Sequence, residues 1–231
     1  MDPLFVALGL IGGIVGLEVL AFARKKRREA HRTAALKEWA AGVGLSIEPG
    51  PKPPEASGLP EALLQRPVFS RGNRPQVANV MEGRAAEGRV VILDHAYVTG
   101  RKNSTTVSQT LVAIELPTPD LPEFVMSPEN VFSKIGQVFG SQDVDFDSSP
   151  RFSSNYQLKG LDEDAIRSLF ERNAVAYLSE NPGWSVEASG PWIVAYRYNH
   201  RAKVSEWSTF FEEALTVIRV IATGTPGSGP F

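Results

Sequence analysis

The most apolar stretch of the chain lies near its start. Residues Leu4 to Ala23 form a run of 20 whose only ionisable side chain is Glu18, and five cations follow it: Arg24, Lys25, Lys26, Arg27 and Arg28. About 20 apolar residues cross a bilayer core of roughly 30 Å. The basic side of such a span stays in the cytoplasm. The pattern predicts a transmembrane anchor at 1–23 of a single-pass protein in the plasma (inner) membrane, with the N-terminus outside.

A cleaved signal peptide is the alternative interpretation of this run. Ala21-Phe22-Ala23 resembles the small-residue site at which such peptides are cut. A signal peptide, however, carries positive charge before its apolar core, whereas here Asp2 precedes the core and the cations follow it. The order of charges therefore favours the anchor.

Glycines in the same run predict contact with another helix. Gly9, Gly12, Gly13 and Gly16 form two overlapping G-x-x-x-G pairs, a spacing that lets helix backbones approach closely. We expect a homo-oligomer or a membrane protein partner at this stripe, although glycine is also simply common in membrane helices. Residues 24–44 are predicted to form a basic juxtamembrane helix, whose cations at 24–28 contact anionic headgroups of the lipid bilayer.

The rest of the chain predicts an α+β cytoplasmic domain at 59–223. The boundary between two sub-lobes of this domain is expected near 150–160. A Pro-rich linker at 45–58 leads into it, and a disordered Gly/Pro/Ser-rich tail at 224–231 ends it. Apolar and β-branched runs separated by short turns indicate an antiparallel β-meander and a second hairpin. An amphipathic C-terminal helix follows. The meander is expected at 76–82, 89–99 and 105–116, the hairpin at 184–188 and 192–198, and the helix at 204–222.

Composition narrows the classes of function. Hydrophobic residues make up 42% of the chain, which is enough for a core. The absence of cysteine excludes disulfides, thiolate zinc sites and cysteine nucleophiles. The net charge of −2, with the cations gathered near the start, argues against nucleic acid as a partner.

Three aspartates form the sharpest polar pattern. Asp143, Asp145 and Asp147 alternate with apolar residues, so on a strand they share one face. Such carboxylates suit Ca²⁺ or Mg²⁺. An EF-hand is absent, because Ser148 and Ser154 stand where that loop needs Gly and Glu. The alternative is a solvated face on an edge strand.

Catalytic patterns are otherwise missing, and we assign no catalytic residue and no cofactor. Asp94 and His95 are sequence neighbours, so on a strand they point to opposite faces and cannot form a dyad with each other. His95 would need a distant acid to become a general base. The sequence contains no G-x-S-x-G, phosphate-binding loop or H-E-x-x-H motif.

A pattern of core, turn and cap residues runs through the middle of the chain: Pro128-Glu129-Asn130-Val131-Phe132, the acidic Asp143–Asp147, Phe152-Ser153, Tyr156, Leu158, Gly160, Asp162-Glu163, Ile166-Arg167 and Leu169-Phe170. On this pattern, the chain from the anchor to about Arg197 resembles a family of uncharacterised bacterial single-pass membrane proteins. The resemblance implies a bacterial membrane setting and no particular activity or catalytic residue.

These observations favour a membrane-anchored cytoplasmic domain that acts as a non-catalytic interaction or assembly module. One alternative is a metal-assisted hydrolase that uses the face of Asp143, Asp145 and Asp147. The other is a domain that binds lipid or a small molecule in an apolar pocket between the sheet and the helix at 204–222.

Overall fold

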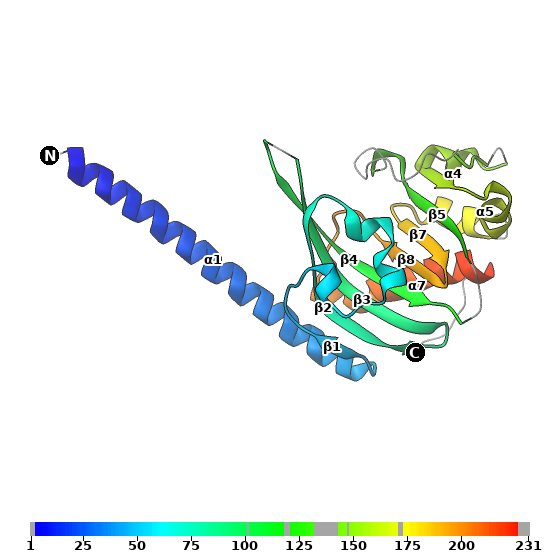
Figure 1. Ribbon diagram of the computed structural model, residues 1–231, viewed down its shortest axis with the longest axis horizontal. Coiled ribbons are helices and arrows are strands. Elements are labelled where there is room, and N and C mark those ends of the chain that lie inside the picture. Colours follow the sequence, from blue (N-terminus) through cyan, green and yellow to red (C-terminus); the bar gives the residue numbers. More distant parts are fainter. Residues whose placement is uncertain are drawn as a thin grey trace.

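The computed structural model describes residues 3–100, 102–117, 121–131, 143–146, 148–170 and 173–225, with side chains from residue 19 onward. One long helix, α1 (Pro3–Gly42), precedes a body built on a β-sheet (Figure 1). The predicted disordered tail lies outside the described residues from 226 onward.

The sheet has eight strands in the order β1-β2-β3-β4-β8-β7-β5-β6, and every neighbouring pair is antiparallel. The strands are β1 (Ser46–Glu48), β2 (Asn73–Ala85), β3 (Gly88–Thr99), β4 (Thr105–Glu115), β5 (Leu121–Pro128), β6 (Tyr156–Gly160), β7 (Ser185–Gly190) and β8 (Trp192–Tyr196).

The predicted fold is wrong in how it groups these strands. We expected a three-strand meander and a separate hairpin behind a membrane helix. Instead β4 pairs with β8 from Leu111–Tyr196 to Glu115–Trp192, so the meander and the hairpin belong to one sheet. This pairing joins residues about 80 positions apart, and local periodicity does not encode such contacts.

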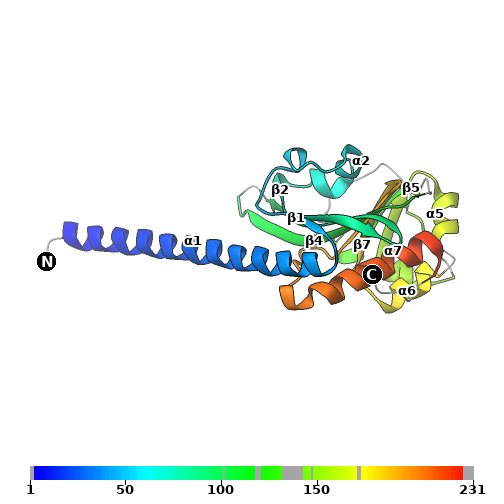
Figure 2. The ribbon, with the colours of Figure 1, turned by 90° about the horizontal axis from the view of Figure 1, so that it is seen from below.

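Two layers cover the sheet (Figure 2). One face packs against α7 (Trp207–Thr223), the end of α1 and the short helices α4 (Pro150–Asn155), α5 (Glu163–Phe170) and α6 (Ala174–Glu180). The other face is covered by residues 53–71, which we call the strap. The strap contains η1 (Pro54–Ala56), α2 (Glu61–Leu64) and η2 (Pro67–Ser70), while η3 (Val204–Glu206) leads into α7.

Alternation along the central strands gives each face its own apolar core. On β3, Val90 and Ile92 belong to the larger core under the helices, and Val91 and Leu93 to the smaller core under the strap. Because successive strand residues point to opposite faces, a strand covered on both sides reads as a nearly continuous apolar run. This explains the sequence Val-Val-Ile-Leu at 90–93.

Helix α1 corrects the membrane prediction. It continues without a break through the Arg24–Arg28 block to Gly42, and its first half projects away from the body (Figures 1 and 2). Among the helices of the described residues, none is long and apolar enough to cross a membrane. This finding contradicts the predicted transmembrane segment, the single-pass topology and the plasma-membrane location, because the side chains of α1 that the structure describes, from Val19 to Gly42, include the cations at 24–28 and have only a short apolar stretch before them.

Candidate functional site

Asp94 of β3 is the centre of a hydrogen-bonded cluster that we call the clamp. Its side chain is only 6% exposed and accepts five hydrogen bonds from four side chains. The donors are Arg32 Nε at 2.9 Å and Nη2 at 2.8 Å, Arg201 Nη2 at 2.9 Å, Asn79 Nδ2 at 2.9 Å and Thr110 Oγ1 at 3.1 Å.

The clamp keeps its carboxylate ionised. Burial by itself disfavours the charged form of Asp94, but the hydrogen bonds and charges of Arg32 and Arg201 outweigh it and lower the pKa of Asp94 below its ordinary value. Arg201 also binds both carboxylate oxygens of Glu29, at 2.7 and 2.6 Å, and this contact lowers the pKa of Glu29. Arg201 therefore binds two carboxylates, the buried one of Asp94 and the partly exposed one of Glu29, while Arg32 binds the carboxylate of Asp94.

A β-bulge positions Asn79 for its part in the clamp. The register of β2 against β3 shifts between Ala78 and Met81, and Asn79 there has φ of +51°. Asn tolerates this left-handed conformation better than most residues. Its Oδ1 accepts a hydrogen bond from Thr33 of α1 at 2.8 Å, while its Nδ2 donates to Asp94. The bulge thus links the sheet to the helix.

The clamp fixes the second half of α1 to the body. Arg32 donates to the carbonyl oxygen of Ala202 at 2.7 Å, and its guanidinium lies 5.1 Å from the ring centre of Trp207. Further along the helix, Leu36 and Ala40 are fully buried in the larger core. Charge and apolar burial together set the direction in which the first half of the helix leaves the body.

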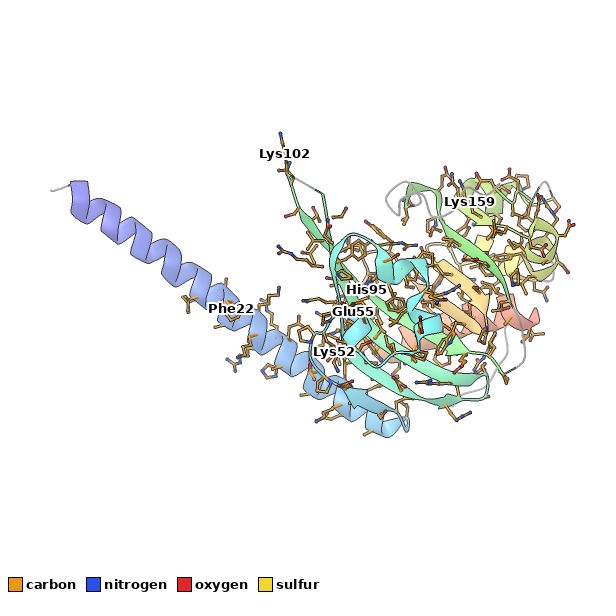
Figure 3. All side chains as sticks on the ribbon, viewed as in Figure 1. Phe22, Lys52, Glu55, His95, Lys102 and Lys159 are labelled. Atoms are coloured by element: carbon orange, nitrogen blue, oxygen red, sulfur yellow. The ribbon has the colours of Figure 1, made fainter. Side chains whose placement is uncertain are left out.

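That first half, residues 3–28, is the feature we call the arm. Val19, Leu20 and Phe22 are 61%, 55% and 70% exposed, and residues 24–28 are exposed as well. Phe22 lies well away from the body in Figure 3. The predicted lipid contact of Arg24–Arg28 stays a prediction. The side chains at the glycine stripe Gly9, Gly12, Gly13 and Gly16 lie outside those that the structure describes.

The predicted aspartate face lies at the β6 edge of the sheet. Asp143 and Asp145 are exposed, and Val144 and Phe146 between and after them are buried. Val144 N donates to Leu158 O at 2.8 Å, and Asp143 lies 4.0 Å from Lys159 Nζ. The expected alternation is therefore present over residues 143–146.

A hollow of about 360 Å³ adjoins these two aspartates. It is lined by Glu129, Asp143, Asp145, Ser153, Ser154, Tyr156 and Gln157. Asp147 lies outside the described residues. No group of three His, Asp or Glu side chains in the described part of the chain is placed to hold a metal ion, and the metal site stays a prediction.

His95 lies on the opposite face of β3 from Asp94, against the small core under the strap. Its ring is 5.7 Å from that of Phe69 and 5.5 Å from that of Tyr97. Burial, together with the charge of Arg71, lowers the pKa of His95 to about 3. The imidazole is thus neutral at physiological pH.

A buried ion pair lies on the same side of the sheet. Glu187 of β7 is wholly buried and pairs with Arg71, while Tyr196 OH donates to it at 2.7 Å and the backbone N–H of Val68 at 2.8 Å. Arg71 also donates to the Tyr196 hydroxyl. Burial raises the pKa of Tyr196 well above its ordinary value, so this phenol stays protonated. The carboxylate therefore joins the strap to two strands.

Sequence reasoning missed most of these polar residues. It singled out Asp94 and His95 and placed them on opposite faces, but it assigned no partner to either. One signal was available in Glu187, which lies in an otherwise small and apolar strand. A carboxylate at such a position needs a buried cation, but the sequence does not say which.

Comparisons with protein-family models, with curated proteins and with solved structures find no match for this chain.

Proposed function

We propose that this protein is a non-catalytic assembly module in which the arm of α1 pairs with the arm of a second copy of the same chain. The observation that carries the proposal is the contrast along one helix. Its second half buries Leu36 and Ala40 and is hydrogen-bonded to the body, whereas its first half exposes Val19, Leu20 and Phe22. Contiguous exposed apolar side chains mark interaction surfaces.

A second copy suits this surface because it brings the same apolar run. The sequence from Leu4 to Ala23 is apolar apart from Glu18, and two such runs bury each other in a symmetric pair. Glycines four positions apart permit two helix backbones to approach closely, as at Gly9 and Gly13.

Charge selects an antiparallel arrangement of the two arms. In a parallel pair, the two Arg24–Arg28 blocks would face each other across an interhelical distance of about 10 Å. In an antiparallel pair centred on Gly13, a rise of 1.5 Å per residue separates the blocks by about 39 Å. That distance is several Debye lengths of about 8 Å, so the repulsion is screened. The two bodies then lie at opposite ends without collision.

Cysteine cross-linking tests both the pairing and its direction. The chain contains no cysteine, so single substitutions report without background. An antiparallel pair centred on Gly13 places residue 7 of one copy beside residue 19 of the other. We expect Ala7→Cys mixed with Val19→Cys to give a disulfide-linked dimer on oxidation, and each variant alone to give little.

The control is Lys37→Cys, which lies exposed on the clamped half of the helix. Sedimentation velocity of the unmodified chain should show a dimer that the double variant Leu20→Lys, Phe22→Lys disperses. A concentration-independent monomer would contradict the assembly role. Efficient cross-linking of each single variant with itself would contradict the antiparallel direction.

A further inference from the structure

A short run of exposed prolines lies at the edge of the sheet, where the chain passes from β1 to the strap. Pro49, Pro51 and Pro53 are all exposed. Because β1 is the first strand in the sheet order, the chain that follows it lies on the outer side of β2. We call residues 49–53 the proline ridge. Lys52, in this stretch, is labelled in Figure 3.

Lys52 fixes the proline ridge against β2. Its N–H donates to Val77 O at 2.9 Å, and its carbonyl oxygen accepts from Val77 N at 2.9 Å. In an antiparallel pair, a residue that exchanges both bonds with its partner has neighbours whose backbone groups point the other way. The backbone groups of Pro51 and Pro53 therefore face outward from the sheet.

This outward edge offers acceptors but no donors at the two proline positions, since proline has no N–H. Pro53 O accepts from Ala56 N at 3.0 Å, and Pro51 O accepts no hydrogen bond from the described residues. A strand that joins a sheet edge pairs with donors as well as acceptors. The proline ridge therefore suits a partner that donates hydrogen bonds and supplies apolar surface, and it does not suit a further β-strand.

The backbone of the proline ridge is already set for recognition as a polyproline II segment. Pro53 has φ of −58° and ψ of 146°, close to the polyproline II values of about −75° and +145°. Lys52 precedes a proline, and this position is confined to extended conformations. Grooves lined by aromatic side chains recognise such preformed segments, which lose little entropy on binding.

The charges beside the proline ridge narrow the kind of groove. Lys52 forms an ion pair with Glu48, so these two charges offset each other. Glu55 follows the ridge, is exposed and has no ion-pair partner among the described residues (Figure 3). The charge left beside the prolines is therefore negative, and it is complementary to a groove with a cation at its rim.

A second copy of this chain does not supply such a groove within the described residues. The large apolar side chains that are exposed there include neither Trp nor Tyr: they are Val19, Leu20, Phe22, Leu161 and Val204. The partner that fits the proline ridge is therefore a different protein.

We propose that the proline ridge is a docking site for an aromatic groove on another protein, with a cation at the groove's rim. The rings of Pro51 and Pro53 pack against Trp or Tyr faces, an indole N–H or phenol O–H donates to Pro51 O, and the cation pairs with Glu55. This surface is separate from the arm, so it does not rest on the proposed assembly.

Two versions of one isolated WW domain serve as probes, because this domain binds polyproline II segments in an aromatic groove. One version carries lysine at the rim of the groove, and the other carries glutamate at the same position. We expect the full chain to shift the NMR signals of groove residues in the isotope-labelled lysine version, and to bind the glutamate version several-fold more weakly. A probe whose groove tryptophan is replaced by alanine should show no shifts.

Substitutions in the chain locate the contact. Pro51→Ala and Pro53→Ala should each weaken binding about tenfold, as expected for the loss of an anchoring side chain. Glu55→Gln should weaken it about threefold, because an exposed ion pair contributes little. Pro117→Ala, which changes an exposed proline after β4, is the matched control and should leave the affinity unchanged.

The arm variant Leu20→Lys, Phe22→Lys should bind the lysine probe as the unmodified chain does, which separates this site from the proposed assembly. Binding that survives both Pro51→Ala and Pro53→Ala, or no binding by either probe, would overturn the proposal. Tighter binding by the glutamate version would overturn the role of Glu55.

Discussion

Asp94 and His95 are neighbours on β3, yet they sit in opposite kinds of environment. Asp94 faces the helices and receives five hydrogen bonds, whereas His95 faces the strap and neither ring nitrogen has a partner among the described residues. A buried carboxylate with several donors stabilises the fold that supplies them. Buried donors without acceptors reduce stability. The helix side of the sheet is thus held rigidly by hydrogen bonds. On the strap side, the ring nitrogens of His95 have no hydrogen-bond partner among the described residues.

The two faces also hold their covering segments by different kinds of contact. The clamp joins α1, the three strands β2, β3 and β4, and the segment before η3, so the arm has a defined direction. The strap is joined to the sheet by a small core and one ion pair.

The largest expected effect comes from removing the charge of Asp94. Asp94→Asn leaves Arg32 and Arg201 facing a neutral amide in a mostly buried site, and breaking a buried pair costs about 3–5 kcal/mol. Urea unfolding should show this loss of stability, and exchange of amides in residues 29–42 should rise. Asp143→Asn, which changes an exposed carboxylate, should alter stability by less than about 0.5 kcal/mol. Equal stability of the two variants would show that the clamp is dispensable.

Acid should weaken the strap side of the sheet. His95 titrates at about 3 in the folded protein and near 6.5 when unfolded, so between these values the unfolded chain binds the extra proton. Stability is therefore lost as pH falls from about 6.5 towards 3, by up to about 1.4 kcal/mol per unit. Arg71 faces the imidazole and opposes its charging, while burial raises the pKa of the adjacent Tyr97 to about 12, so that phenol stays neutral.

Unfolding free energies measured from pH 7 to pH 4 check this slope. In His95→Phe the slope over that range should flatten. Asp94 adds a separate loss at lower pH, because its folded pKa lies below the ordinary value and its contribution disappears as the carboxylate protonates. An unchanged slope in His95→Phe would mean that other groups dominate the acid response.

The smallest effect concerns His95 itself at neutral pH. His95→Phe removes two buried nitrogens without partners and keeps an aromatic ring against Phe69 and Tyr97. We expect a gain of about 1–2 kcal/mol in unfolding free energy. Gln109→Leu should act in the same direction. A loss of stability in both variants would indicate that these side chains already have partners in solution.

Part of the arrangement can be predicted from local pattern alone. The run at 90–93 indicates a strand covered on both faces, and the alternation at 143–146 places two aspartates outward, because strand periodicity is a property of the backbone. The opposite directions of Asp94 and His95 follow from the same rule. The partners of both residues do not, since Arg32, Asn79 and Arg201 lie 62, 15 and 107 positions from Asp94.

Local pattern was also insufficient for the apolar run at 4–23. Its composition predicts a helix that spans a membrane, whereas in the structure the helix runs on through the cations to Gly42 and is fixed to the body by Glu29 and Arg32. The sequence by itself determined the helix, the strands and their two faces, because these depend on neighbours in the chain. Only the tertiary structure decided the joining of β4 to β8, the clamp around Asp94 and the ion pair of Glu187 with Arg71 under the strap. These contacts join residues that are far apart in the chain, so no local pattern in the sequence indicates them.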